Sequence, residues 1–280
     1  MTPDPVVTTA WLAERLDDPK IRVFDASWFM PGAPRDPDQE YAAGHIPGAL
    51  RFDIDGLSDH TSPLPHMLST PSEFATAMRR LGLNADSIAV AYDSEGLFSA
   101  ARAWWNLRAM GHDASFVLEG GLPRWIAEGR PVETGWREPA HGDFKAHPRP
   151  TLVDDLEAVR TALNQRSAQV LDARPAPRFR GEAPEPRAGL RGGHMPGALN
   201  LPWSAVIEDG ALLPADRLRP LFEGAGVDPK GPIVTTCGSG VSAAILALAL
   251  ARLGRLDVPV YDGSWSEWGG RMDTPVATGA

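Results

Sequence analysis

The sequence is poor in cysteine, since Cys237 is the only one among its 280 residues. A single cysteine excludes an internal disulfide and fits a reducing compartment. Long apolar runs are missing as well: the longest, residues 241–250, is too short to cross a bilayer. The first residues lack the basic segment and apolar core of a secretory signal. We therefore expect a soluble, cytoplasmic protein that does not span a membrane.

Excess positive charge is also absent. The chain has 27 Lys and Arg against 36 Asp and Glu, a formal net charge of −9. Nucleic-acid-binding proteins usually present a basic face, so we expect no nucleic-acid partner. The seven histidines show no metal-ligand spacing with the cysteine or with one another, and we predict no metal and no cofactor.

Arginines nevertheless gather in one stretch of the second half. Most such runs form a solvated face of the protein, but guanidinium groups also bind carboxylates and sulfur oxyanions with two parallel hydrogen bonds. The sequence therefore leaves two interpretations open, a solvated surface or an anion site. The residues concerned are Arg174, Arg178, Arg180, Arg187 and Arg191.

The surroundings of Cys237 favour a reactive thiol over a packing one. Residues 233–236 form a short β-branched run, Gly238 and Gly240 follow the cysteine, and an alanine- and leucine-rich run comes next. This pattern predicts a strand, a tight loop and a helix. Inward-pointing loop amides and a helix N-terminus stabilise negative charge, which favours the nucleophilic thiolate. A buried structural cysteine is the alternative, but it does not require the two glycines.

The chain repeats itself. Four landmarks of the first half return in the same order and at nearly constant spacing in the second half. The clearest is Gly-His-Ile-Pro-Gly-Ala-Leu at 44–50, which returns as Gly-His-Met-Pro-Gly-Ala-Leu at 193–199. The other pairs are 21–26 with 169–174, 88–93 with 233–237, and 117–121 with 260–264.

Each repeat alternates short apolar runs with helical patterns. This predicts an α/β fold of two tandem domains, each a mainly parallel sheet flanked by helices. Proline-rich sequence with little periodicity indicates a linker. We place the domains at 1–138 and 151–280, with the linker at 139–150. Asp93 takes the place of the cysteine in the first repeat, and since aspartate cannot carry a transferable sulfur, we predict that the first domain is inactive.

Together, the duplication, the Gly-His motif and the cysteine loop resemble the two-domain rhodanese superfamily. Within it, the sequence Cys-Gly-Ser-Gly-Val at 237–241 is similar to the loop of the 3-mercaptopyruvate sulfurtransferases, which usually ends in threonine where this chain has Ser242. The thiosulfate-specific branch typically has an Arg-Lys pair at the positions of Gly238 and Ser239. Residues 62–68 also resemble the superfamily's interdomain segment.

The resemblance implies a role for each of several residues. Cys237 would be the nucleophile, and Arg178 and Arg187 would bind the substrate carboxylate. Gly238, Gly240, Val241 and Ser242 would complete the active-site loop. The superfamily's proposed Ser/Asp/His relay falls on Ser239, Asp36 and His45, whereas the same motif in the second repeat gives His194 a turn-stabilising role.

The implied reaction moves sulfur from 3-mercaptopyruvate to Cys237 as a persulfide and releases pyruvate. The acceptor would be thioredoxin, a small thiol or cyanide. Three alternatives stay open: a thiosulfate sulfurtransferase, a non-catalytic persulfide- or redox-sensing module, and a cysteine-dependent phosphatase. The phosphatase is disfavoured because those enzymes close their loop with an arginine where this chain has Ala243.

Overall fold

The computed structural model describes residues 4–279, which form two five-stranded parallel sheets. The first sheet has the order β1 (Val6–Val7), β5 (Ser115–Leu118), β4 (Ile88–Tyr92), β2 (Ile21–Asp25) and β3 (Leu50–Arg51). The second has the order β6 (Val153–Asp154), β12 (Val260–Tyr261), β11 (Ile233–Thr236), β7 (Gln169–Asp172) and β8 (Leu199–Asn200). The two orders are equivalent strand by strand. The predicted α/β fold of two tandem, mainly parallel domains is confirmed.

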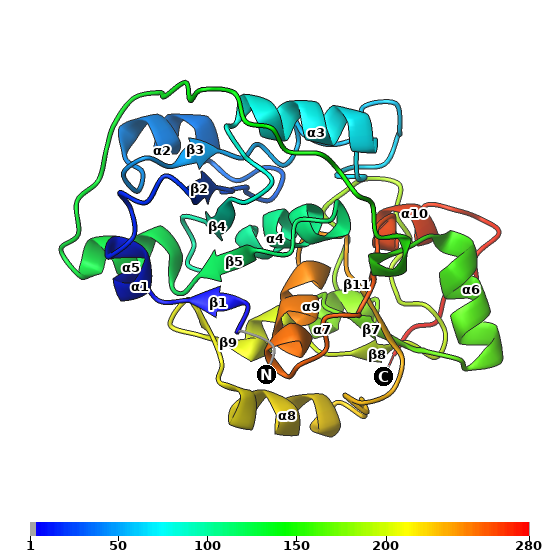
Figure 1. The fold of residues 1–280 in the computed structure, drawn as a ribbon. Helices are drawn as coiled ribbons and strands as arrows, with labels where there is room; N and C mark the ends of the chain where they lie inside the picture. The colour runs from blue at the N-terminus through cyan, green and yellow to red at the C-terminus, as the bar shows by residue number, and fades with distance from the viewer. Residues whose placement is uncertain (1–3, 280) are drawn as a thin grey trace.

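Helices flank both sheets (Figure 1). The first half contains α1 (Thr9–Ala13), α2 (Pro37–Ala43), α3 (Pro71–Arg80), α4 (Ala100–Ala109) and α5 (Gly121–Ala127). The second contains η1 (Pro150–Leu152), α6 (Leu156–Gln165), α7 (Ala176–Phe179), η2 (Trp203–Val206), α8 (Ala215–Gly224), α9 (Ala243–Arg252) and α10 (Ser264–Trp268). A short antiparallel ribbon, β9 (Ile207–Glu208) and β10 (Ala211–Leu212), precedes α8. Within residues 4–279, no helix has the length and apolar character needed to cross a membrane.

The two domains share one apolar core. Helix α4 of the first domain packs against α9 of the second, and the largest buried cluster contains residues from both (Figure 1). Residues 243–251 of α9 are all buried, which fits a helix that is apolar on every side. Because each of the two helices follows the loop at the cysteine position of its own domain, their packing brings the two loops to the same interface.

The segment between the domains runs across the first domain as an extended strap. Its backbone is held at several points: the amide of Phe144 donates to Leu83 O over 3.1 Å, and that of His147 donates to Met110 O over 2.8 Å. The Phe144 ring is buried against Phe74. Residues 139–150 are therefore fixed to the first domain, and the proposed division at 138 and 151 stays a prediction.

Asp93 fills the loop of the first domain. Its side chain is fully buried, and its carboxylate accepts hydrogen bonds from four backbone amides. They belong to Glu95, Phe98, Ser99 and Ala100, at 2.7–3.0 Å. The loop thus closes around an anion that belongs to the chain itself.

Replacing Asp93 should destabilise the protein. In Asp93→Ala the four amides lose their acceptor while remaining buried, and we expect the free energy of unfolding to fall by about 3 kcal/mol. Urea denaturation followed by circular dichroism measures this. Asp93→Asn, which keeps one acceptor oxygen, should lose less. An Asp93→Ala protein as stable as the wild type would contradict the role given to the carboxylate.

Candidate active site

Cys237 lies immediately after β11, at the start of the loop that leads into α9. Its side chain is nearly buried, with 2 % exposed. The Cys237 amide donates to Ser264 Oγ at 3.2 Å, and its carbonyl accepts from the amide of Trp265 at 3.0 Å. The next carbonyl, Gly238 O, accepts from the amide of Ser266. The first turn of α10 therefore holds the cysteine in place.

The loop after Cys237 contains backbone N–H groups that the rest of the protein does not use. Among residues 4–279, the amides of Ser239, Gly240, Val241 and Ser242 have no backbone or side-chain oxygen as acceptor. The corresponding loop of the first domain directs its amides at the Asp93 carboxylate. By analogy, the loop around Cys237 offers these donors to a negative group carried by the cysteine.

Two of the five clustered arginines converge on this loop. Arg178, on α7, is paired with Glu185, and its Nη2 lies so close to Gly238 that a Cβ there would be 3.0 Å away. Arg187 has no salt-bridge partner within residues 4–279. Burial lowers the pKa of Arg187, negative charge on Cys237 raises it, and the neighbouring Arg178 lowers it. The pKa of Arg187 lies below its ordinary value, chiefly because of burial, and Arg187 lies near enough to Cys237 and Arg178 for their charges to act on it.

The other three arginines have structural partners. Arg174 is buried between Asp172 and Glu185, at 2.7 and 2.8 Å, and lies over the ring of Trp265. It therefore orients the carboxylate that holds Arg178. The remaining two support the surface and the C-terminal segment: Arg180 pairs with Glu182, and Arg191 donates to Trp268 O and Thr274.

The first domain contributes a histidine and an aspartate that the sequence did not identify. His66 is buried, with Nδ1 3.3 Å from Ser239 O and Nε2 3.0 Å from Asp55 Oδ1. The other Asp55 oxygen accepts from Trp28 Nε1 at 2.9 Å. Burial raises the pKa of the Asp55 carboxyl, but its hydrogen bond to His66 and the charge of that ring outweigh burial, and the pKa lies below its usual value.

The structure does not bring His45 and Asp36 to the cysteine loop. His45 Nδ1 is 2.8 Å from Tyr41 O, and its ring stacks on Tyr41. His194 makes the same contacts with Phe179, so both histidines stabilise equivalent turns. Asp36 caps α2 by accepting from the backbone amides of residues 38 and 39. This corrects the expected relay, because Asp55 and His66, and not Asp36 and His45, lie beside Ser239.

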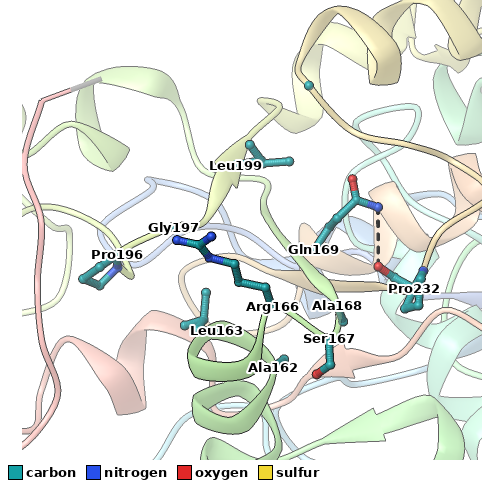
Figure 2. Close-up of a pocket in the computed structure, with 11 residues that line it drawn as sticks. Ala162, Leu163, Arg166, Ser167, Ala168, Gln169, Pro196, Gly197, Leu199 and Pro232 are labelled. Carbon is teal, nitrogen blue, oxygen red and sulfur yellow. Dashed lines mark hydrogen bonds between the residues drawn. The ribbon is translucent and has the colours of Figure 1, made fainter.

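Two hollows of the molecule lie away from Cys237. One of about 530 Å³ surrounds Arg166, Gln169 and Gly197 (Figure 2). Gln169 pairs with Ile233, and Cys237 lies four residues further along the neighbouring parallel strand, so the two are separated by about 13 Å along the sheet. An equivalent hollow surrounds Gly48 in the first domain. Because the hollow recurs in both domains, it is a property of the repeated fold.

Comparison with known proteins places the chain in a family. The model of the rhodanese-like domain matches residues 8–128 and 155–271. The chain belongs to the rhodanese-like family. The 3-mercaptopyruvate sulfurtransferase of Escherichia coli is 51 % identical over 267 residues, which cover 95 % of each chain. A mitochondrial thiosulfate/3-mercaptopyruvate sulfurtransferase of Arabidopsis thaliana is 42 % identical and covers 98 % of this chain and 78 % of its own.

The fold agrees with a solved member of the family. The crystal structure of SseA, a 3-mercaptopyruvate sulfurtransferase from Escherichia coli, superimposes with a TM-score of 0.87 at 47 % identity. The match covers 94 % of this chain and 99 % of that chain. The fold is therefore shared over nearly the whole length of both chains.

The positive charge beside Cys237 can be tested without knowing the substrate. Because Cys237 is the only cysteine, iodoacetate and iodoacetamide both report on it alone as thiol reagents. Arg187→Gln should lower the ratio of the iodoacetate rate to the iodoacetamide rate about tenfold, since one charged hydrogen bond contributes about 1.5 kcal/mol or more. Arg180→Gln, which removes a surface charge paired with Glu182, is the control and should leave the ratio unchanged. An unchanged ratio in Arg187→Gln would remove Arg187 from the site.

Proposed function

We propose that the chain is a 3-mercaptopyruvate sulfurtransferase, which moves sulfur from 3-mercaptopyruvate through a Cys237 persulfide to a thiol or cyanide acceptor and releases pyruvate. The observation that carries the proposal is a single cysteine at the start of a loop whose amides have no acceptor within residues 4–279, with Arg178 against Gly238 of that loop and Arg187 close enough to interact with the charge of Cys237. The names and identities of the relatives support the same reaction.

The two arginines suit a small α-keto acid. The substrate carries a carboxylate next to a keto group, with the thiol one carbon further. Arg187, without a carboxylate partner of its own, binds the substrate carboxylate with its planar fork. Arg178, held by Glu185 over Gly238, faces the keto oxygen and stabilises the charge that develops there. The substrate sulfur then points at Cys237.

Sulfur transfer follows from this placement. The Cys237 thiolate attacks the substrate sulfur, an S–S bond forms, and the C–S bond breaks. The electron pair of the broken bond passes to carbon and gives the enolate of pyruvate. The proton that the substrate thiol carried is transferred to that carbon, so pyruvate leaves and Cys237 retains a persulfide anion. The loop amides stabilise the anion as they would the thiolate.

His66 is placed to move the proton. Both of its ring nitrogens face oxygen acceptors, Ser239 O and Asp55 Oδ1, which the ring satisfies together only when both nitrogens carry hydrogen. Asp55 stabilises that charged form. We assign the relay to Asp55, His66 and the Ser239 hydroxyl, with His66 as the donor of the proton that the enolate takes up.

The second half of the cycle removes the outer sulfur. An acceptor thiolate, from thioredoxin or a small thiol, or a cyanide ion attacks the outer sulfur atom of the persulfide. The S–S bond breaks and the Cys237 thiolate leaves, ready for the next donor. The electron pair passes to carbon when the C–S bond breaks and to the Cys237 sulfur when the S–S bond breaks, so the steps as written require no cofactor.

Thiosulfate is the second candidate donor, because the Arabidopsis relative carries both donors in its name. A cation directly after the cysteine would suit the second charge of thiosulfate, but this chain has Gly238, and Arg178 occupies the space beside it. We therefore assign 3-mercaptopyruvate as the preferred donor. A persulfide-sensing module without turnover is the non-enzymatic alternative.

Steady-state assays with both donors test the proposal. Pyruvate release from 3-mercaptopyruvate with a dithiol acceptor should be fast in the wild type and lost in Cys237→Ser, while thiosulfate with cyanide should be a poor pair. A preference for thiosulfate would overturn the assignment of the donor. Absence of turnover with either donor would favour the sensing module.

The two histidines should differ in their effect on the rate. His66→Gln removes the proton donor, and we expect kcat to fall about 100-fold or more, with loss of the pH dependence that the imidazole supplies. His45→Gln is the matched control: it should lower the melting temperature but keep kcat within about twofold, because His45 only supports a turn. A large fall in kcat for His45→Gln with little change for His66→Gln would instead assign the proton transfer to His45.

A further inference from the structure

Arg102 is a fully buried arginine of the first domain whose charge is neutralised by the second. It lies in the first turn of α4 with 0 % of its surface exposed. Its Nη2 is 2.6 Å from Oδ1 of Asp262, which directly follows β12. The guanidinium plane also lies over the ring of Trp105, at 4.3 Å. The pair therefore crosses the interface between the domains.

The same side chain bonds to His66 and to Gly240, the residue next to Ser239. Arg102 Nη1 donates to Gly240 O, next to Ser239 in the loop, and Nη2 donates to the carbonyl of His66. The second oxygen of Asp262 accepts from the amide of Leu68 at 2.7 Å. His66 has a φ of 63°, a left-handed conformation that side-chain-bearing residues seldom adopt. The bonds to the His66 carbonyl and to the Leu68 amide hold that conformation.

Gly240 is required by this arrangement. Its φ is 79°, and a Cβ built there would lie 2.7 Å from Arg102 Nη1. The approach of the arginine to the loop therefore depends on the absence of a side chain. Glycine at position 240 is therefore required for two reasons: its own positive φ and the close approach of Arg102 from the other domain.

The duplication shows that Arg102 serves the cysteine loop specifically. Arg102 is the third residue of α4, and the third residue of the equivalent helix α9 is Ile245, which is apolar and buried. Of these two equivalent positions, only Arg102, which reaches the loop of Cys237, carries a charge. The loop of the first domain is closed by Asp93 and needs no such support.

A buried ion pair contributes little stability compared with apolar side chains of the same volume, because removing two charges from water costs about as much as their attraction returns. Stability therefore does not explain the Arg102–Asp262 pair well. Its hydrogen bonds to the backbone of Gly240, His66 and Leu68 explain it better. We propose that Arg102 is a positioning residue of the sulfur-transfer site, which fixes the Gly240 and His66 carbonyls together and so sets His66 and the loop amides relative to Cys237. The proposal rests on the proposed function.

The test uses a variant that keeps the charge. Arg102→Lys can still neutralise Asp262, but its single ammonium cannot reproduce the fork that reaches both carbonyls. We expect kcat for pyruvate release to fall about 10- to 100-fold, with the KM for 3-mercaptopyruvate within about threefold and an altered pH profile of kcat. Arg108→Lys is the matched control, since Arg108 lies on the same helix and bonds across the interface to Leu256 O without touching the loop. It should leave all three values unchanged.

A second variant removes the pair without leaving a buried charge. Arg102→Met combined with Asp262→Asn should fold, since neutral replacement of a buried pair is tolerated, and should show the same loss of kcat. Wild-type kcat and pH profile in either folded variant would overturn the proposal. A double variant that does not fold would assign the pair to stability and would overturn it as well.

The rate of Cys237 alkylation by iodoacetamide separates this proposal from the proposed function. Arg102→Lys should slow it at least threefold, because displaced amides stabilise the thiolate less, and Arg108→Lys should not. If the wild type released no pyruvate, the proposed function would fail, and the alkylation rates alone would decide on Arg102. Equal rates in wild type and Arg102→Lys would then exclude a positioning role.

Discussion

The structure depends on a short loop whose backbone amides point at one place between a strand and a helix. Burying such N–H groups without an acceptor costs free energy. A negatively charged group at the centre of the loop removes that cost by accepting their hydrogen bonds. In the first domain, the carboxylate of Asp93 is that group and accepts the hydrogen bonds of the loop amides. The second places Cys237 there, and the amides become available to a thiolate or persulfide. One constraint of the fold thus gives a structural element in one copy and a reactive centre in the other.

The first domain has Asp93 at the cysteine position, and other residues of this domain contact the loop of Cys237. Packing of α4 against α9 brings the two loops to one interface, where the chain can use residues from both copies. His66 and Asp55 reach Ser239 from the first domain, and Arg102 bonds to Gly240. The duplication is therefore asymmetric: the second domain contains Cys237 and the arginines to which we assign substrate binding, and the first contains His66, to which we assign proton transfer, and the groups that hold it.

The sequence predicted the features that depend on local patterns. The tandem α/β fold follows from landmarks that recur in order, and the loop around Cys237 follows from its glycines and its flanking strand and helix. The residues of the proposed relay were harder to predict from sequence, because their position depends on how a loop of one domain packs on the other. His66 lies in an irregular segment without periodicity, whereas His45 lies in a motif that is conspicuous in sequence. The sequence predicted a turn role for His194 alone, and the structure gives His45 the equivalent contacts. Asp36 precedes a proline-initiated helix and is an N-cap in the structure, a role typical of aspartate at that place.

The central claim is that the sulfur of 3-mercaptopyruvate is carried by Cys237 itself. The most direct measurement is a single turnover without acceptor, in which released pyruvate is counted and the peptide containing Cys237 is weighed by mass spectrometry. The account predicts one pyruvate per chain and a gain equal to the mass of one sulfur atom on that peptide, reversed by adding cyanide. Pyruvate released without added mass on Cys237, or sulfur found elsewhere on the chain, would contradict it.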